Sequence, residues 1–452
     1  MKLTFLGAAS TVTGSKTLLS TDKQQVLIDC GLFQGYKNLR ALNWTAFPFD
    51  AQNIDAVVLT HAHLDHSGAL PLLVNQGFRG AIYATPSTID MCQILLLDSA
   101  KLQQEEADFA NRHHTTQHPV ALPLYTVADV RQTLRLFKPL EFDRALEVCK
   151  GISVRLRPAG HILGASSAEI TAEGKTVLFS GDLGRPNDPI MHPPAPIERA
   201  DYVVMESTYG NRTHGSDDAQ AQLGEVIRRT AERGGIVVIP SFAVGRAQEI
   251  LLAIYKLKID KLIPNLPIYL DSPMAINTTA LYQKHCKEHR LVGRECAGMA
   301  TVAKMVKTQE QSRALSAVRY PSVIVSASGM ATGGRVLHHL KTFASDHRNT
   351  IVFAGFQAGG TRGARIVAGE KSVRIFGEDV PIHAEVVSLD GMSAHADAHE
   401  LMTWLKTIKR APKTVFLNHG EPEAADALRL EIKHSLGWSA MVPLLGQQVE
   451  LK

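Results

Sequence analysis

Short runs of β-branched and other apolar residues recur along the chain and stop at polar residues or a glycine. Runs of this form occupy residues 26–28, 57–60, 177–179, 203–205 and 415–417. Continuous apolar runs of this kind are typical of strands that are buried on both faces of a sheet. Proteins built from such strands place functional groups just beyond the strands' carboxyl ends. The pattern therefore predicts an α/β fold with functional side chains directly after these runs.

A second series of apolar runs lies in the middle of the chain and alternates with stretches of helical period. The expected strands are 236–240, 268–270, 323–326 and 351–354, and the expected helices are 217–233, 245–256, 275–289 and 334–343. Ser216 is the expected N-cap of the first helix, and Gly234 lies just past its end. Regular alternation of strands and helices favours a separate, mostly parallel α/β layer.

Composition narrows the class of protein without fixing a function. A length of 452 residues suggests two or three domains, and an apolar content of 45% supports large cores. No apolar run is long enough to cross a bilayer, and the N-terminus lacks the apolar stretch of a secretory signal. Five cysteines without a CxxC pair favour a reducing cytoplasm over a disulfide scaffold. A net charge of +4 permits a polyanionic partner but does not demand one.

The densest group of metal-ligand side chains follows the run at 57–60. His61, His63, Asp65 and His66 stand within six consecutive residues. Imidazole and carboxylate groups together suit zinc or a similar divalent ion. On a tight loop, the first two side chains can face one way while the last two face another, so that one loop serves two metals. This interpretation is favoured over a solvated loop with histidines by chance.

Three further ligand side chains stand at other expected strand ends. His161 follows an Ala-Gly pair, Asp182 follows the run at 177–179, and His419 follows the run at 415–417. Taken singly, they have ordinary explanations as a loop histidine, an N-cap and a turn residue. Taken together, they supply the ligands that the first loop lacks.

With these motifs in hand, the sequence resembles the metallo-β-lactamase superfamily. His61 to His66 fits the HxHxDH signature of that superfamily, and the remaining metal-site motifs are matched in order by Asp29, His161, Asp182 and His419. The resemblance implies an αββα sandwich that binds two Zn²⁺ ions per chain. It implies one zinc held by His61, His63 and His161, a second held by Asp65, His66 and His419, and a bridging Asp182. Asp29 would orient the ligand loop from behind.

The long gap between Asp182 and His419 points to one branch of this superfamily. Glu206, His395 and His419 resemble motifs A, B and C of the β-CASP nucleases, and the similarity covers essentially the whole chain. The chain looks like bacterial relatives of the endonuclease subunit of the mRNA cleavage and polyadenylation factor. The implied domains are residues 1–209 and 372–452, which form the metallo-β-lactamase domain, and residues 210–371, which form an inserted, mostly parallel α/β β-CASP domain.

The resemblance implies a ribonuclease that hydrolyses phosphodiester bonds with two zinc ions. Two close metal ions can activate a nucleophile and clamp a phosphate. The expected catalytic residues are Asp65, Asp182, Glu206 and His395. His395 is the candidate general acid, and Glu206 could fix its tautomer and favour its charged form. The alternative is that His395 is only a residue near the N-cap of a helix that starts near Asp397.

Several residues are candidates for contacts with RNA or with its phosphates. A Ser-Gly-Met sequence before a helix and a glycine-rich loop at 355–363 offer backbone amides to an anion, and arginines can contact a nucleic-acid backbone. Helix caps and solvated arginines are the competing explanation. The candidates are Ser207, Thr208, Ser241, Arg246, Ser328, Gly329, Met330, Arg335, Thr361 and Arg362.

Other functions remain open on the same motifs. They are a DNA nuclease of the Artemis-like branch, a hydrolase of small thioesters or lactones, and an inactive RNA-binding scaffold. Single-stranded RNA is the expected partner, a homodimer is allowed, and no membrane partner is expected. We expect neither the extra C-terminal domain of RNase J-like enzymes nor the N-terminal extension of archaeal relatives. Specificity is then expected to come from the two core domains or from a partner.

Overall fold

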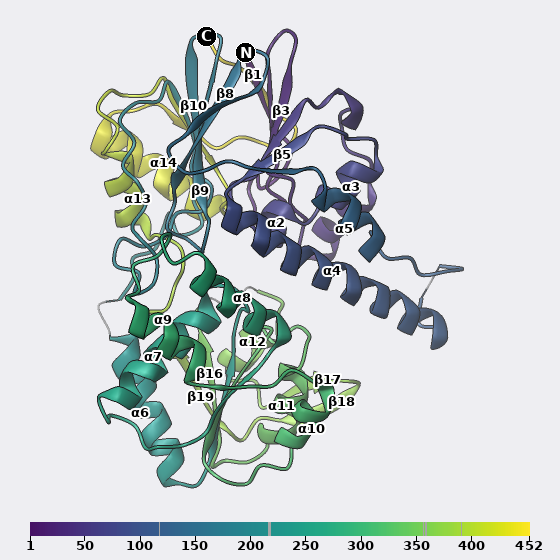
Figure 1. The fold of residues 1–452 in the computed structure, drawn as a ribbon, viewed down its shortest axis with the longest axis vertical. Helices are drawn as coiled ribbons and strands as arrows, with labels where there is room; N and C mark the ends of the chain where they lie inside the picture. Colours follow the sequence, from purple (N-terminus) through teal and green to yellow (C-terminus); the bar gives the residue numbers. More distant parts are fainter. Residues whose placement is uncertain (117, 216–217, 356, 358, 390) are drawn as a thin grey trace. The chain divides into compact units, whose positions relative to one another are not determined.

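The structure is a computed structural model that describes residues 1–116, 118–215, 218–355, 357, 359–389 and 391–452. The chain forms two compact units (Figure 1). The first unit comprises Met1–Asp188, His192–Thr213 and His395–Lys452, and the second comprises Pro189–Met191 and His214–Ala394. Among the described residues, no helix has both the length and the apolar character that crossing a membrane requires.

The first sheet of unit one is mixed, with strand order β22-β1-β2-β3-β4-β5-β6. Neighbours from β22 to β3 are antiparallel, and neighbours from β3 to β6 are parallel. The parallel strands end at one edge of the sheet, where Asp29 follows β3 and His61 lies just beyond β4. The strands are β1 (Lys2–Phe5), β2 (Thr17–Ser20), β3 (Gln25–Ile28), β4 (Ala56–Val58), β5 (Ala81–Ala84), β6 (Phe137–Pro139) and β22 (Gln448–Glu450).

The second sheet of unit one has strand order β21-β20-β11-β10-β9-β8-β7. Strands β7 to β10 are antiparallel neighbours, whereas β10, β11, β20 and β21 are parallel. In this register Glu206 of β11 pairs with Asn418 of β20, so residues far apart in sequence become neighbours. The strands are β7 (Ala145–Cys149), β8 (Ile152–Pro158), β9 (Ser166–Ala172), β10 (Lys175–Phe179), β11 (Tyr202–Glu206), β20 (Thr414–Asn418) and β21 (Ala440–Met441).

The inner faces of these two sheets share one apolar core. Phe5 and Ile28 of the first sheet lie in the same buried cluster as Phe179 and Phe416 of the second. The Phe5 and Phe416 rings are 5.4 Å apart between centroids. Helices α2–α5 lie on the outer side of the first sheet and α13 and α14 on the outer side of the second (Figure 1). The expected αββα sandwich is therefore confirmed.

The helical segments of unit one include one long helix, α4, which begins at Pro86 with Thr85 as its N-cap. The segments are α1 (Lys37–Ala41), η1 (Leu42–Trp44), η2 (Ala51–Asn53), α2 (Leu64–Ser67), α3 (Leu70–Asn75), α4 (Pro86–Arg112), α5 (Val127–Leu134), α13 (Ala398–Leu405) and α14 (Pro422–Leu436).

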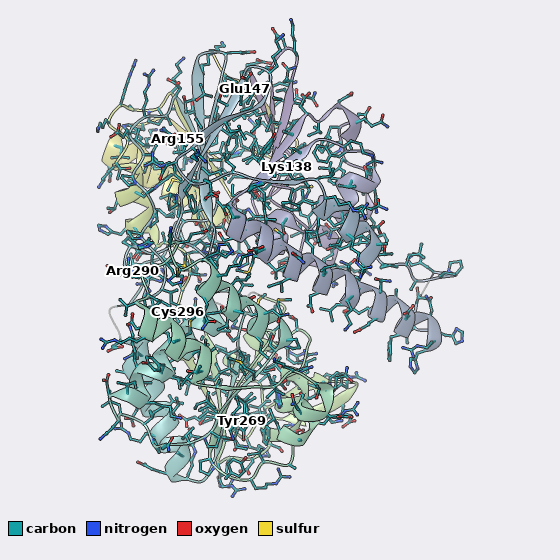
Figure 2. The ribbon with its side chains drawn as sticks, in the orientation of Figure 1. Lys138, Glu147, Arg155, Tyr269, Arg290 and Cys296 are labelled. Atoms are coloured by element: carbon teal, nitrogen blue, oxygen red, sulfur yellow. The ribbon has the colours of Figure 1, made fainter. Side chains whose placement is uncertain are left out.

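Unit two is built on a parallel sheet with strand order β14-β13-β15-β12-β16-β19. This confirms the inserted parallel α/β layer. Tyr269 of β13 is labelled in Figure 2, and its hydroxyl forms a hydrogen bond of 2.9 Å with the hydroxyl of Tyr320. The strands are β12 (Ile236–Pro240), β13 (Ile268–Asp271), β14 (Lys304–Met305), β15 (Ser322–Ser326), β16 (Thr350–Ala354), β19 (Glu385–Leu389) and the hairpin β17 (Ser372–Ile375) and β18 (Glu378–Pro381).

The four expected helices of unit two correspond to α6, α7, α8 and α11 and differ from them at their ends, whereas α9, α10 and α12 were not expected. The expected N-cap Ser216 lies outside the described residues, and α6 is capped by Asp218, whose carboxylate accepts from two backbone amides. Helix α8 ends at Lys284 rather than 289, because His285 leaves the helical conformation. The helices are α6 (Ala219–Glu232), α7 (Arg246–Ile259), α8 (Pro273–Lys284), α9 (Gly293–Thr301), α10 (Gln309–Leu315), α11 (Val336–Phe343) and α12 (Arg362–Val367).

Unit two also takes in a strand that the sequence analysis did not anticipate. Residues 385–389 form β19, which pairs in parallel with β16 over five residues. The expected division at residue 371 therefore falls before the last strand of this sheet, and the compact unit runs to Ala394.

Candidate metal centre

The ligand loop, which runs from the end of β4 through the short helix α2, is held by backbone hydrogen bonds from two other segments. The backbone amide of Ser15 donates to the carbonyl oxygen of Asp65 at 2.7 Å. The backbone amide of Cys30 donates to the carbonyl oxygen of His66, also at 2.7 Å. A Cβ atom on Gly31 would lie 1.5 Å from the carbonyl oxygen of Asp65. Glycine is therefore required for the close approach that fixes the loop.

Three imidazoles of the expected first site converge in the structure. His63 Nδ1 lies 3.2 Å from Nε2 of His61 and 3.2 Å from Nε2 of His161. The same two Nε2 atoms lie 3.6 and 3.7 Å from Oδ2 of Asp182. These four residues form a group whose ligand atoms all lie within 4.8 Å of one another.

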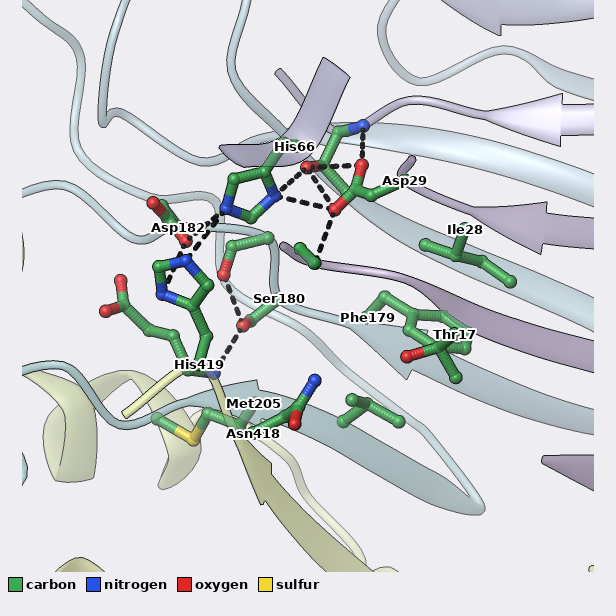
Figure 3. A pocket seen from close by; sticks show the side chains of 15 residues that line it. Thr17, Ile28, Asp29, His66, Phe179, Ser180, Asp182, Met205, Asn418 and His419 are labelled. Atoms are coloured by element: carbon green, nitrogen blue, oxygen red, sulfur yellow. Dashed lines mark hydrogen bonds and ion pairs between the residues drawn. The ribbon is translucent and has the colours of Figure 1, made fainter. Parts of the chain in front are cut away.

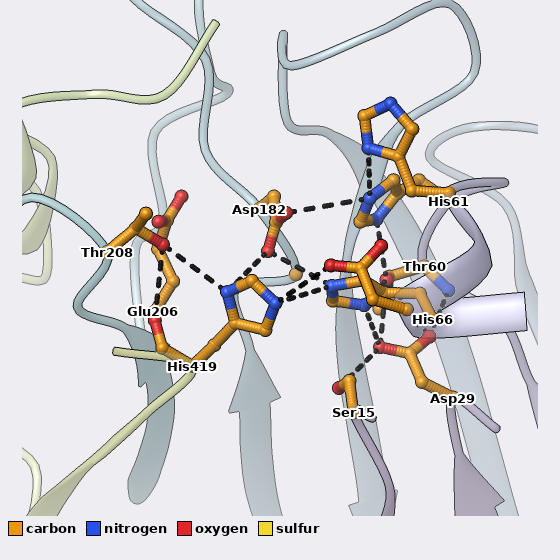
Figure 4. Close-up of polar contacts among 12 residues, drawn as sticks. Ser15, Asp29, Thr60, His61, His66, Asp182, Glu206, Thr208 and His419 are labelled. Atoms are coloured by element: carbon orange, nitrogen blue, oxygen red, sulfur yellow. Dashed lines mark hydrogen bonds and ion pairs between the residues drawn. The ribbon is translucent and has the colours of Figure 1, made fainter. Parts of the chain in front are cut away.

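The residues of the expected second site form an adjacent group (Figure 4). Nε2 of His66 lies 3.1 Å from Nε2 of His419, and that atom lies 3.4 Å from Oδ2 of Asp65. Oδ1 of Asp182 lies 3.3 Å from His66 Nε2 and 3.5 Å from His419 Nδ1. One oxygen of Asp182 thus faces the first group and the other faces the second.

Hydrogen bonds among these side chains do not use all of their lone pairs, whereas binding of metal cations would. One ring nitrogen offers one hydrogen-bonding direction, so His63 Nδ1 can form a regular bond with only one of its two imidazole neighbours. Oδ1 of Asp182 is buried and accepts no regular hydrogen bond from the described residues. A cation in each group would use all these lone pairs, and neutral imidazole and carboxylate are ordinary zinc ligands.

Asp29 and Thr60 set the tautomers of two of these histidines. Nδ1 of His66 lies 2.7 Å from Oδ2 of Asp29, so an N–H at Nδ1 donates to the carboxylate and Nε2 keeps its lone pair. The Thr60 hydroxyl lies 3.0 Å from both Asp29 oxygens and 3.2 Å from Nδ1 of His61. Because its one proton goes to Asp29, its oxygen accepts from His61, and Nε2 of His61 points into the centre with a lone pair.

Thr60 was missed by the sequence analysis, as was Ser15, whose hydroxyl donates to Asp29 at 3.2 Å. The position of Thr60, between a strand end and the first ligand histidine, is a signal that could have been used. Nothing in the sequence near Ser15 marks it as a neighbour of this loop.

Burial and the surrounding charges shift the pKa values in opposite directions. Burial, with help from the neighbouring His66, holds the pKa of His61 well below its usual value, and burial also lowers the pKa of His63. Burial opposes ionisation of Asp182, but His419, His66 and His61 together lower its pKa well below the usual range. For His66, burial is outweighed by the Asp182 and Asp29 carboxylates, which raise its pKa well above the usual value. Without a cation, the centre thus favours neutral His61 and His63, a charged His66 and an ionised Asp182. A cation bound at Nε2 of His66 would displace the proton from that nitrogen.

His395 and Glu206 form a hydrogen-bonded pair at the edge of the centre. Nδ1 of His395 lies 3.2 Å from Oε2 of Glu206 and 4.0 Å from Oδ2 of Asp182. Glu206 is fixed by the backbone amide of Leu183, which donates to its Oε1 at 2.5 Å. Burial lowers the pKa of His395, but the charge and hydrogen bond of Glu206 raise it to about 9. The side chain of His395 is 22% exposed, whereas that of Glu206 is fully buried.

Two of the expected phosphate contacts lie beside the second group. The Ser207 hydroxyl donates to the carbonyl of Asn418 at 2.9 Å, and Oγ1 of Thr208 lies 3.3 Å from Nδ1 of His419. Behind the same ligands, an interior pocket between the two sheets is lined by residues such as Ile28 and Met205 (Figure 3). The described contacts thus place Ser207 and Thr208 as supports of His419.

The remaining expected phosphate contacts lie in unit two, beyond the carboxyl ends of its parallel strands. Ser241 follows β12, and Thr361 caps α12 by accepting from the amide of Ala364. Gly329 approaches Phe242 so closely that a Cβ atom there would lie 2.7 Å from the phenyl ring. The other candidates at this edge are Ser328, Met330, Arg246, Arg335 and Arg362.

The arginines at this edge have local partners. Arg335 donates to Oδ1 of the buried Asp271 at 2.7 Å and to the carbonyl of Val306 at 3.0 Å. Arg246 is buried and pairs with Glu249, and Arg362 donates to backbone carbonyls, including that of Arg374 at 2.9 Å. These contacts give each guanidinium a structural task that sequence reasoning did not foresee.

The sandwich and its paired ligand groups define a class of metallo-hydrolase, and comparison with known proteins agrees. The chain belongs to the metallo-β-lactamase superfamily, whose family model matches residues 12–264. A Beta-Casp domain matches residues 247–366, and a Zn-dependent metallo-hydrolase RNA specificity domain matches residues 379–443. The last of these matches contains both His395 and His419.

Individual relatives are similar over most of the chain. Ribonuclease TTHA0252 of Thermus thermophilus is 39% identical, over 100% of this chain and 98% of its own length. Transcription termination factor FttA of Methanosarcina mazei is 34% identical, over 94% of this chain and 67% of its own. A crystal structure of a protein of unknown function from Enterococcus faecalis V583 covers 100% of this chain and 99% of that one with a TM-score of 0.55. At 15% identity, that likeness concerns the fold alone.

The close approach at Gly31 gives a test of the centre's support. Gly31→Ala should displace the Asp65 carbonyl and loosen the ligand loop, which lowers the affinity for divalent metal about 10-fold or more. Metal content after dialysis against a graded chelator series measures the effect. Gly293→Ala is the matched control, because a Cβ atom there meets no atom within 4 Å. Equal metal retention in the two variants would contradict the role of Gly31.

Proposed function

We propose that the protein is a zinc-dependent ribonuclease that hydrolyses phosphodiester bonds of single-stranded RNA. The observation that carries the proposal is the position of Asp182, with one oxygen toward each of two ligand groups. Two metal ions, when bound, would supply a nucleophile at neutral pH and a clamp on the phosphate. Similarity to ribonuclease TTHA0252 over the full chain supports RNA as the substrate.

We propose two Zn²⁺ ions per chain. The first would be held by His61, His63 and His161, the second by Asp65, His66 and His419, and Asp182 would bridge them. Asp29 would hold His66 in the ligating tautomer from behind, with the help of Thr60.

His395 is the proposed general acid, and Glu206 is the proposed positioning residue. With Nδ1 of His395 facing Glu206, Nε2 is the nitrogen that would deliver a proton to the departing oxygen. The raised pKa keeps the imidazole protonated at neutral pH, as a general acid requires. Asp65 and Asp182 would act through the metal ions.

The domain roles follow the same proposal. The segments 1–209 and 372–452 would carry the chemistry, and the insert at 210–371 would contact the RNA backbone. A homodimer and a cytoplasmic location stay predictions. Against the alternatives, the RNA specificity domain at residues 379–443 favours RNA over DNA and over a small thioester or lactone, and the full ligand set argues against an inactive scaffold.

Removing the shared carboxylate tests the two-metal assignment. Asp182→Ala should bring the zinc content from about two ions to well below one per chain, because both groups lose a ligand. Elemental analysis of the purified protein measures it, with Asp426→Ala, an exposed carboxylate on α14, as control. A variant that keeps one full equivalent would mean that Asp182 serves one ion only.

Removing the proposed acid separates proton transfer from metal binding. His395→Ala should keep its zinc and its affinity for RNA, yet lose ~100-fold or more in kcat. Glu206→Gln should lose less, because it only orients the imidazole, and a substrate with a better leaving group should partly rescue His395→Ala. The exposed His399→Ala is the control. Wild-type turnover by His395→Ala would show that another group protonates the leaving oxygen.

The substrate class is tested by kcat/KM on single-stranded RNA and DNA of one sequence at one salt concentration. We expect RNA to be cleaved faster, because the 2′-OH offers a contact that DNA lacks. A generic thioester in the same assay tests the small-molecule alternative. Comparable or faster cleavage of DNA would move the protein to the Artemis-like function.

A further inference from the structure

Two large aromatic side chains stand out on the surface of unit one, close in sequence to the ligand loop. Tyr36 is 62% exposed and Trp44 is 63% exposed. Tyr36 is the N-cap of the short helix α1, and Trp44 is the last residue of the turn η1 that follows it; neither element buries any of its residues. Core packing therefore does not explain these two rings.

The charges on this segment are all positive. Between Leu32 and Phe49 the sequence carries Lys37 and Arg40 and no carboxylate. Both cations are exposed, and neither side chain has an ion pair or hydrogen bond within the described residues. The same holds for the Tyr36 hydroxyl and the Trp44 indole N–H. Within the described residues, the segment thus combines positively charged side chains that have no ion-pair partner with exposed aromatic rings.

The segment is nevertheless anchored. The Asn43 side chain accepts from the amide of Phe33 at 2.9 Å and donates to the carbonyl of Phe33 at 2.8 Å. This pair of bonds closes the loop and places Trp44 one residue from the anchor. Further on, the rings of Phe47 and Phe49 stack with centroids 5.2 Å apart.

The anchor is tied to the metal centre through the backbone. The amide of Leu32 donates to the carbonyl of Leu64 at 2.8 Å, and Leu64 stands between His63 and Asp65. Tyr36 is four residues beyond Leu32, so its Cα lies within about 14 Å of that contact. A single strand cut at the centre can therefore reach the segment with a few nucleotides.

On this basis, which rests on the proposed function, we propose that Tyr36, Lys37, Arg40 and Trp44 form an RNA-binding platform. Bases flanking the cleaved bond stack on Tyr36 and Trp44, and phosphates pair with Lys37 and Arg40. Exposed rings with interleaved cations are the pattern by which proteins hold single strands without reading sequence. The platform adds affinity on one side of the cut and leaves the chemistry to the metal centre.

Fluorescence gives a direct readout of stacking. Of the chain's three tryptophans, Trp404 is buried and Trp438 half-buried, so Trp44 is the one most exposed to quenching by a bound base. A poly(U) oligonucleotide of about 15 residues, added to the cleavage-deficient His395→Ala protein, should quench the emission. Trp44→Phe in this background should abolish the quenching yet keep most of the affinity, because phenylalanine still stacks.

Alanine variants measure the contribution to binding. Trp44→Ala and Tyr36→Ala should each weaken binding of this RNA about fivefold or more. In the cleaving protein the loss should appear in KM, so that kcat/KM falls more for a 15-mer than for a trinucleotide. The combined change Lys37→Ala and Arg40→Ala should flatten the slope of log Kd against log salt by about 1.4. Phe109→Ala, an exposed ring on α4, is the control and should change none of these quantities.

The outcomes separate the platform from the proposed function. If wild-type protein cleaves RNA while Trp44→Ala and Tyr36→Ala match Phe109→Ala in Kd and KM, the platform is wrong and the ribonuclease stands. If wild-type protein neither binds nor cleaves RNA, the proposed function fails first. A change of oligomeric state in Trp44→Ala at unchanged RNA affinity, measured by light scattering, would assign the surface to a protein partner and overturn the proposal.

Discussion

The shared carboxylate of Asp182 is the constraint on which the first unit depends. Both oxygens lie within 3.7 Å of imidazole nitrogens, and Asp182 is only 2% exposed. Burying one carboxylate among several imidazoles is costly unless each group is held at a fixed separation. The sandwich meets this demand because its ligands follow strands whose inner faces are joined by one apolar core. Disturbing that core would therefore disturb the metal site as well.

Parallel pairing explains how residues far apart in sequence reach one place. Strand β20 pairs with β11, and β11 with β10, so Asp182, Glu206 and His419 emerge at the same edge of one sheet. The chain between them can form a second unit without moving these ends, because β11 and β20 are paired over five residues. An insertion in this connection is thus compatible with an intact centre.

The sequence predicted this edge well, because apolar strands followed by His, Asp or Glu leave a local signal. Features that depend on contacts between distant segments of the chain left no such local signal in the sequence. Thr60 looks like the end of a strand, yet its hydroxyl determines the tautomer of His61 only once Asp29 lies beside it. Arg335, the N-cap of α11, looked like a phosphate contact, but it pairs with Asp271 at the end of strand β13. Strand β19 carries one half-buried charge, Glu385, and one exposed polar residue, Ser388, among its apolar residues, so it could be recognised only from its pairing with β16.

Exposure divides the residues of the centre into buried ones, which keep its geometry, and partly exposed ones, which can contact a substrate. His61, His66, His161 and Asp182 are almost fully buried, which suits residues that must keep their geometry through a reaction. The side chains of Asp65 and His395 are 21% and 22% exposed, so they form the rim where a phosphate could enter. The proposed general acid, His395, belongs on that rim, since it would have to meet the departing oxygen. Glu206 can be buried, because its partners are the imidazole of His395 and the backbone amide of Leu183. Residues that only add affinity for the RNA do not need to be buried in the same way. Contacts that bind the flanking single strand equally before and during cleavage can be exposed, as the rings of the proposed platform are.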